Sequence, residues 1–187
     1  METGSSRYAS KFQHTPVLVE EVLKSVEKIP KELVKNGLII DTTVGGAGHA
    51  SLILNSYPDV RLIGIDQDPY AREAASKRLL NFGSRAQIVA SNFADFKPPE
   101  KVIFILADLG VSSPQLNEPT RGFSFRDDGP IDMRMNTDNG INAAELLSKM
   151  NEEELADTIY KFGEEKLSRR IARRIKSDLS IHGPYSG

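Results

Sequence analysis

The sequence has no cysteine and no tryptophan among its 187 residues. It can therefore form no disulfide, no thiolate metal site and no cysteine nucleophile, and we predict no metal. No apolar run approaches the roughly 18 residues of a membrane-spanning helix, and residues 1–13 lack the apolar segment of a secretory signal. The net charge of −2 gives no overall attraction to nucleic acid, so an RNA site would need a local basic patch. These absences favour a soluble cytoplasmic protein with no membrane partner.

Four apolar runs alternate with helical patterns along the first two thirds of the chain. The predicted strands cover 38–41, 61–66, 87–90 and 102–107, and the predicted helices cover 17–29, 50–55 and the segment from Pro69, then 143–149 and 152–176 with a candidate break at Gly163. The helix from Pro69 is expected to bury Ala71, Ala74, Ala75, Leu79 and Leu80. Strands alternating with helices predict βαβ units and a parallel sheet, an α/β fold.

A glycine-rich turn follows the first predicted strand, between Asp41 and His49. Glycines let the backbone approach a ligand closely, and the N–H groups at a helix start face it. Asp66 ends the next strand 20 residues after Gly46, the spacing at which a carboxylate accepts the ribose hydroxyls of an adenosine cofactor. This pair alone does not separate nicotinamide cofactors from S-adenosylmethionine.

The third and fourth strand ends add polar and aromatic groups at the same edge of the sheet. Phe93 could stack on an adenine or be a core aromatic, and the sequence alone leaves both readings open. Asp108 leaves the fourth strand where ligands bind in open α/β sheets.

Several motifs recur together in the order found in one known family. They are His14-Thr-Pro-Val-Leu18, Asp41-x-Thr-x-Gly-x-x-Gly-His49, Asp66-x-Asp68-Pro69, Asp108-Leu-Gly-Val-Ser-Ser-Pro-Gln-Leu116, Arg121-Gly-Phe-Ser-Phe125 and Gly129-Pro-Ile-Asp-Met-Arg-Met135. The chain resembles, from about His14 to Pro184, the bacterial 16S ribosomal RNA cytosine-N4 methyltransferases, which use S-adenosylmethionine. The resemblance implies a Rossmann-like class I methyltransferase core and methylation of a cytosine N4 near the decoding site of small-subunit ribosomal RNA.

The resemblance also implies a set of cofactor contacts. The family's pocket corresponds to the backbone of Ala47, Gly48 and His49 and to the side chains of Asp66, Phe93, Asp108 and Gln115. Ala47 departs from the family, which usually has glycine there. Its methyl group is tolerable at negative φ and hinders close approach at positive φ.

Asp108 is the residue we expect to act in catalysis. Cytosine N4 is a weak nucleophile because its lone pair is delocalised into the ring. A carboxylate that accepts its N–H bonds would localise that pair and stabilise the developing positive charge. In the same family scheme no metal and no nucleophilic side chain is needed.

Two basic segments are candidate RNA contacts. The loop 121–135 offers Arg126 and Arg134 beside Phe123 and Phe125, groups suited to single-stranded RNA, although such a loop could also pack over the sheet. A later basic helix offers three more arginines, namely Arg170, Arg173 and Arg174. It could equally present a solvated face, with a buried stripe of Leu167, Ile171 and Ile175.

The chain is expected to divide into a flexible arm (1–13), a cofactor-binding core (14–116) and a loop with part of an inserted helical domain (117–187). Family members are longer and have seven strands, so this sheet would be incomplete, with its fourth strand an exposed edge open to self-association. Two alternatives remain beside the methyltransferase: an inactive fragment that retains cofactor or RNA binding, and an NAD-dependent oxidoreductase.

Overall fold

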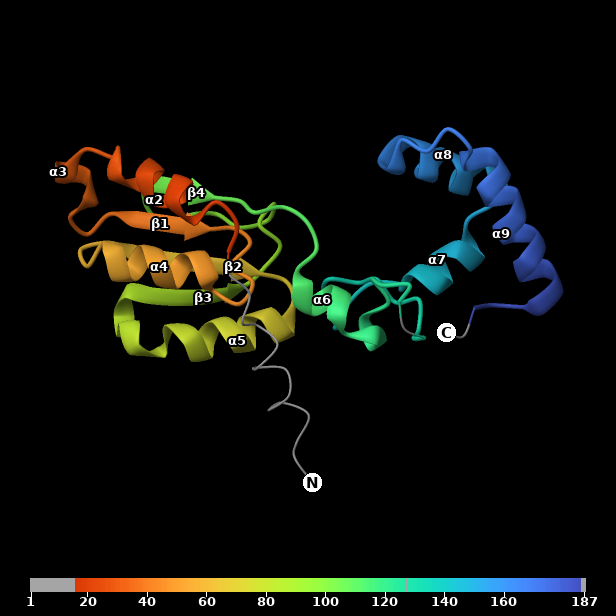
Figure 1. Cartoon of the computed structure of the whole chain (residues 1–187), viewed down its shortest axis with the longest axis horizontal. Coiled ribbons are helices and arrows are strands. Elements are labelled where there is room, and N and C mark those ends of the chain that lie inside the picture. The colour runs from red at the N-terminus through yellow and green to blue at the C-terminus, as the bar shows by residue number, and fades with distance from the viewer. Residues whose placement is uncertain (1–15, 127, 186–187) are drawn as a thin grey trace, which may run out of the picture. The chain divides into compact units, whose positions relative to one another are not determined.

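A computed structural model describes residues 16–126 and 128–185 and divides the chain into two compact units, one ending at Pro114 and one beginning at Gln115 (Figure 1). The predicted arm 1–13 and His14 lie outside the described residues.

The first unit alternates strands and helices as the sequence predicts. Its strands are β1 (Leu38–Asp41), β2 (Arg61–Asp66), β3 (Ala86–Ala90) and β4 (Val102–Leu106). Its helices are α2 (Val19–Glu27), α3 (Lys31–Val34), α4 (Gly48–Ser56), α5 (Pro69–Leu79) and the 3₁₀ segment η1 (Leu80–Arg85). The short helix α3 was not predicted, because four residues are too few to show a helical period.

The four strands form one parallel sheet in the order β3-β2-β1-β4, which confirms the predicted α/β fold. In this order β1 lies between β2 and β4, so the carboxyl ends of three strands meet at one edge. β4 is a terminal strand of the sheet, and the side chain of Ile105 on it is 60% exposed.

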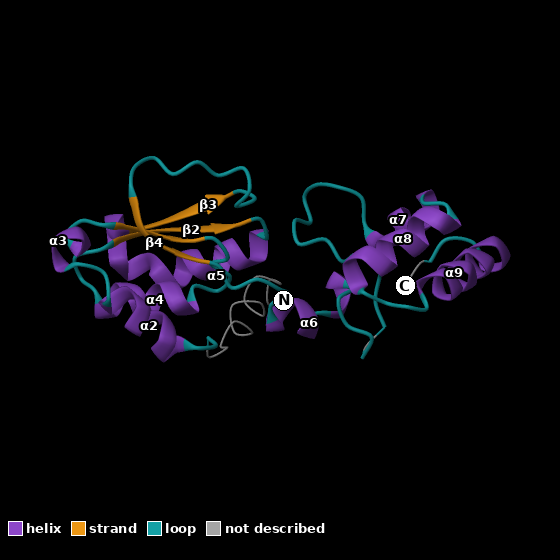
Figure 2. Ribbon diagram, turned by 90° about the horizontal axis from the view of Figure 1, so that it is seen from above, coloured by secondary structure: helices purple, strands orange, loops and turns teal. Residues whose placement is uncertain are grey.

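Helices and a loop cover the two faces of this sheet. The helices α2, α4 and α5 pack on one face, where Ile39 and Leu62 are fully or almost fully buried (Figure 2). On the other face Ile40 and Ile65 pack with Phe96, which belongs to the β3–β4 connection. The expected burial of Leu80 is wrong: it is exposed, because α5 ends at Leu79 and the following 3₁₀ turn changes the direction of the side chain.

The second unit is helical. Its elements are α6 (Ser113–Asn117), which spans the unit boundary, η2 (Pro119–Arg121), α7 (Ala143–Lys149), α8 (Glu152–Gly163) and α9 (Ser168–His182). Helix α7 has its predicted bounds, and the expected break at Gly163 separates α8 from α9.

The predicted buried stripe on the last helix is wrong at two of its three positions. Leu167 precedes α9 and is 57% exposed, and Ile171 is also exposed. The buried positions are Ser168 and Ala172, with Ile175 partly buried beside them. Helix α8 packs closely against these small side chains. The face of α9 that contacts α8 is therefore rotated about the helix axis from the apolar stripe that hydropathy alone suggests.

No helix within the two described ranges is long and apolar enough to cross a membrane. Those ranges also contain no group of three histidine, aspartate or glutamate side chains arranged to hold a metal ion.

Candidate cofactor site at the carboxyl edge of the sheet

The glycine-rich turn after β1 is held to the end of β2 by backbone donors. The Val44 N–H donates to the carbonyl of Ile65 at 3.0 Å, and the Gly45 N–H donates to Asp66 Oδ2 at 2.9 Å. Gly45 has a φ of 51°, a left-handed conformation that glycine adopts without strain. Asp66 Oδ1 accepts a further bond from the Asp68 N–H at 2.9 Å. Asp66 therefore fixes the turn as well as ending β2.

The same turn is held to the end of β4 by two threonines. Thr42 donates to the carbonyl of Leu106 from both its backbone N–H and its hydroxyl, each at 2.8 Å. The hydroxyl of Thr43 accepts a bond from the Asp108 N–H at 2.7 Å. Sequence reasoning missed both threonines, and their hydroxyl groups directly after a strand end were the only available signal.

Ala47 is the residue before α4 and has a φ of 60°. At this positive φ a side chain is expected to hinder the close approach of a ligand to the backbone. The side chain of Ala47, however, is fully buried in the core. Its N–H donates to the carbonyl of Val44 and its carbonyl accepts from Ser51, so both backbone groups are engaged within the protein. The amides of Gly48 and His49 belong to the first helical turn, where N–H groups have no partner inside the helix.

His49 connects the start of α4 to the chain before α2. Its Nε2 lies 2.7 Å from the carbonyl oxygen of Val17, so this nitrogen carries the proton and donates. Pro16 lies against Gly48, where an added Cβ would meet the proline ring at 2.4 Å. The imidazole thus has a structural role, and a ligand would meet His49 through its backbone.

Carboxylates from three strand ends converge at this edge. Asp41 is almost completely buried, and its pKa is raised to about 7: burial raises it most, the Thr43 N–H bond lowers it, and the charges of Asp66 and Asp108 raise it. Burial also raises the pKa of Asp66, against the backbone N–H groups of Asp68 and Gly45. The edge of β1, β2 and β4 is therefore acidic, as expected for strands whose ends meet.

The remaining predicted cofactor residues differ in exposure. Phe93 follows β3 and is 48% exposed, which argues against the core-aromatic reading. Asp108 is exposed after β4, and its backbone N–H donates to the Thr43 hydroxyl. Gln115 is 93% buried in α6 and is the first residue of the second unit. It is therefore not part of the site formed by the first unit.

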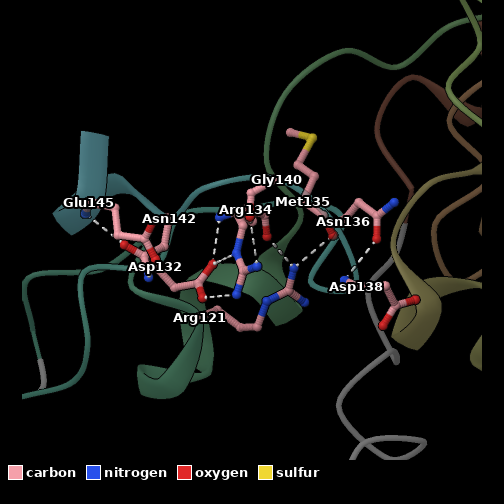
Figure 3. A network of polar contacts seen from close by, with 9 residues as sticks. All are labelled: Arg121, Asp132, Arg134, Met135, Asn136, Asp138, Gly140, Asn142 and Glu145. Atoms are coloured by element: carbon pink, nitrogen blue, oxygen red, sulfur yellow. Dashed lines mark hydrogen bonds and ion pairs between the residues drawn. The ribbon is translucent and has the colours of Figure 1, made fainter. Parts of the chain in front are cut away.

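Arg134, a predicted RNA contact, is bound within the second unit (Figure 3). Its guanidinium donates to both carboxylate oxygens of Asp132, at 2.9 and 2.7 Å, and to the carbonyl of Gly140 at 3.2 Å. The pKa of Asp132 is lowered because Arg134 donates to it. Buried Arg121 donates to the carbonyls of Arg134 and Met135, so this network orders the loop from within.

The other predicted RNA contacts are more accessible. Arg126 and Arg170 are exposed and form no ion pair with another described residue. Arg173 pairs with Glu152 at 3.3 Å, and Arg174 pairs with Asp178 at 3.2 Å. These surface pairs contribute about 0–1 kcal/mol, so either arginine can exchange its partner for a phosphate.

An open groove in the second unit contains the aromatic side chains of the predicted RNA-binding loop. Phe123 and Phe125 line it together with His182 and Tyr185. The side chain of Phe125 is fully exposed, which is the condition for stacking on a base.

Comparison with known proteins assigns a family to the chain. The model of the MraW methylase family matches residues 11–182. The protein named ribosomal RNA small subunit methyltransferase H of Prochlorococcus marinus strain SARG is 61% identical over all 187 residues. The protein of the same name from Synechococcus sp. strain WH7803 is 56% identical over 179 residues, which are 95% of this chain.

These relatives are longer than the chain, which spans 61% and 59% of their lengths. Among solved structures, the plantazolicin methyltransferase BpumL in complex with SAH is 20% identical, with a TM-score of 0.36, over 54% of this chain and 39% of that one. This structural likeness is too low to bear on the site. The match to the family model over residues 11–182 is sufficient by itself: the chain belongs to the MraW methylase family.

Proposed function

We propose that this chain carries the cofactor site of an S-adenosylmethionine-dependent ribosomal RNA methyltransferase that modifies N4 of a cytosine near the decoding site of the small subunit. The observation that carries the proposal is the turn after β1, whose glycine is bonded to Asp66 while its threonine is bonded to the Asp108 backbone. The family assignment and the names of the relatives support the same class of reaction.

The residues at this edge fit an adenosine cofactor. Each oxygen of Asp66 accepts one backbone N–H, and a carboxylate has about four acceptor positions, so two remain for the ribose hydroxyls. The amides of Gly48 and His49 face the ligand from the start of α4, and exposed Phe93 stacks on the adenine. S-adenosylmethionine, when bound, supplies a methyl group on a positively charged sulfur.

Asp108 then acts on the target amine. Its carboxylate accepts an N–H bond from cytosine N4 and concentrates the nitrogen lone pair toward the methyl carbon. Bound S-adenosylmethionine would supply the methyl carbon to this nitrogen, and its neutral thioether would be the leaving group. The amine proton passes along its hydrogen bond to Asp108 and from there to solvent water. Alignment of nitrogen, carbon and sulfur supplies most of the rate enhancement.

The acidic edge disfavours the NAD-dependent oxidoreductase. Asp41, Asp66 and Asp108 make this edge acidic, which disfavours the anionic pyrophosphate of a dinucleotide because like charges repel. The same carboxylates attract a sulfonium cation. The inactive fragment that keeps cofactor or RNA binding is the second candidate, because the chain spans about 60% of its relatives.

The proposed partners are small-subunit ribosomal RNA and the 30S subunit, in the cytoplasm. Exposed Arg126 and Arg170 would contact phosphates, with Arg173 and Arg174 joining after exchange of their surface pairs. Arg134 would act indirectly, by ordering the loop. We also propose that the chain self-associates through β4, since its exposed Ile105 lies on a terminal strand.

A methyl-transfer assay tests this function. The 187-residue chain is incubated with methyl-labelled S-adenosylmethionine and unmodified 30S subunits, and the RNA is digested to nucleosides. Labelled N4-methylcytidine, lost in Asp108→Asn but retained in Asp59→Asn, supports the proposal; exposed Asp59 lies just before β2, at the opposite end of the sheet. Cofactor binding without transfer favours the inactive fragment, and label in another nucleoside contradicts the N4 assignment.

A further inference from the structure

Among the described residues, the backbone of Asp108 has one hydrogen-bond partner, and that partner is far away in the sequence. The β1–β4 ladder ends where Asp41 pairs with Leu106. Asp108 lies two residues beyond that end, before Gly110 with its φ of 135°. Its N–H is held by the hydroxyl of Thr43 at 2.7 Å, across 65 residues of sequence. Because the strand pairing ends before Asp108, this bond takes the place of a ladder hydrogen bond in holding the exposed residue.

Thr43 is itself held on both sides. Its N–H donates to Asp41 Oδ1 at 3.2 Å. The next two residues of the turn are bonded to the end of β2, through Ile65 and Asp66. One hydrogen bond therefore joins the proposed ribose-binding Asp66 to Gly45, another joins Thr43 to the proposed catalytic Asp108, and the short backbone segment 43–45 connects the two.

We infer that Thr43 is a positioning residue that holds Asp108 in place relative to Asp66 at the cofactor site. This inference rests on the proposed function. The hydroxyl oxygen acts as an acceptor, so serine at this position retains the bond and valine, of nearly the same shape, removes it. Thr42 provides a matched control: in Thr42→Val, the carbonyl of Leu106 still accepts the Thr42 N–H, so the strand junction keeps its backbone bond.

The first measurement needs no ligand. Amide hydrogen exchange at Asp108, followed by NMR in the full 187-residue chain, reports the bond directly. Thr43→Val should accelerate exchange roughly 10-fold, as expected for loss of one hydrogen bond, while Thr43→Ser and Thr42→Val should leave it near the wild-type rate. Unchanged exchange in folded Thr43→Val overturns the inference, whatever the chain binds.

The second measurement is a double-mutant cycle on the dissociation constant of S-adenosylmethionine, by calorimetry. Thr43→Val should weaken binding roughly 3- to 10-fold, Thr43→Ser should restore it, and Thr43→Val should have no further effect in an Asp108→Ala background. Additive effects would show that Thr43 acts without Asp108 and would overturn the inference.

Two other outcomes separate this inference from the proposed function. If the wild-type chain does not bind S-adenosylmethionine, the proposed cofactor site fails and the positioning role fails with it, even where the exchange data show the bond. If the chain binds and Asp108→Ala binds equally well, the cofactor site stands, but Asp108 contributes nothing to cofactor binding, and a role of Thr43 at this site through Asp108 is overturned.

Discussion

Replacing Asp41 by asparagine should stabilise the chain at alkaline pH far more than at acidic pH. The side chain is 2% exposed, and burial raises its pKa from the ordinary 3.8 to about 7. Between these two pH values Asp41 loses its proton in the unfolded chain but keeps it in the folded chain. Its contribution to the free energy of unfolding therefore falls by about 1.4 kcal/mol for each pH unit. The loss is complete above about pH 7, where it amounts to about 4 kcal/mol.

Asparagine resembles the protonated carboxyl group and keeps an oxygen to accept the Thr43 N–H. Urea unfolding at pH 5 and pH 8 measures the difference between variant and wild type. From pH 5 to pH 8, the free energy of unfolding of Asp41→Asn should rise by about 3 kcal/mol relative to that of the wild type. Asp66, whose pKa is also raised, titrates in both proteins, so most of its contribution cancels in the comparison.

Exposed Asp59 supplies the control, because Asp59→Asn should leave the pH dependence of stability unchanged. Parallel stability curves for wild type and Asp41→Asn between pH 5 and pH 8 would contradict the raised pKa of Asp41. They would show that the carboxylate of Asp41 is ionised in the folded chain at little cost.

Three further substitutions test other parts of the structure. Gly122→Ala should make the loop 123–131 more sensitive to limited proteolysis, since φ is 71° and the added Cβ would meet the Pro130 carbonyl oxygen at 2.4 Å; equal cleavage rates would contradict this. Asn151→Ala removes the capping box of α8 and should cost about 1 kcal/mol in thermal unfolding, whereas an unchanged midpoint would show that the cap contributes little. Ile105→Lys should abolish self-association in sedimentation, and a monomeric wild-type chain would refute the β4 contact.

The sequence predicts β1, β2 and α7 with their observed bounds because local signals mark their ends. Both strands end at an aspartate after an apolar run, and Asn142 caps α7 by accepting from the Glu145 N–H. The parallel order follows from alternation of strands and helices. Convergence of Asp41, Asp66 and Asp108 follows in turn, since parallel strands end at the same edge.

The sequence did not predict side-chain partners that only the tertiary structure brings together. The bond between Thr43 and Asp108 spans 65 residues, and nothing local indicates it. Arg134 looks like a phosphate contact in a polar loop, yet Asp132 takes its guanidinium. On α9 the packing of α8 favours Ser168 and Ala172 over larger apolar residues, so hydropathy gives the wrong face.

Calorimetric titration of the 187-residue chain with S-adenosylmethionine, with NADH as the control ligand, tests most directly whether the four described strands form a cofactor site. We expect saturable binding of S-adenosylmethionine alone, lost in Asp66→Ala and kept in Asp59→Asn. Binding of NADH alone, or of neither ligand by a folded chain, would contradict it.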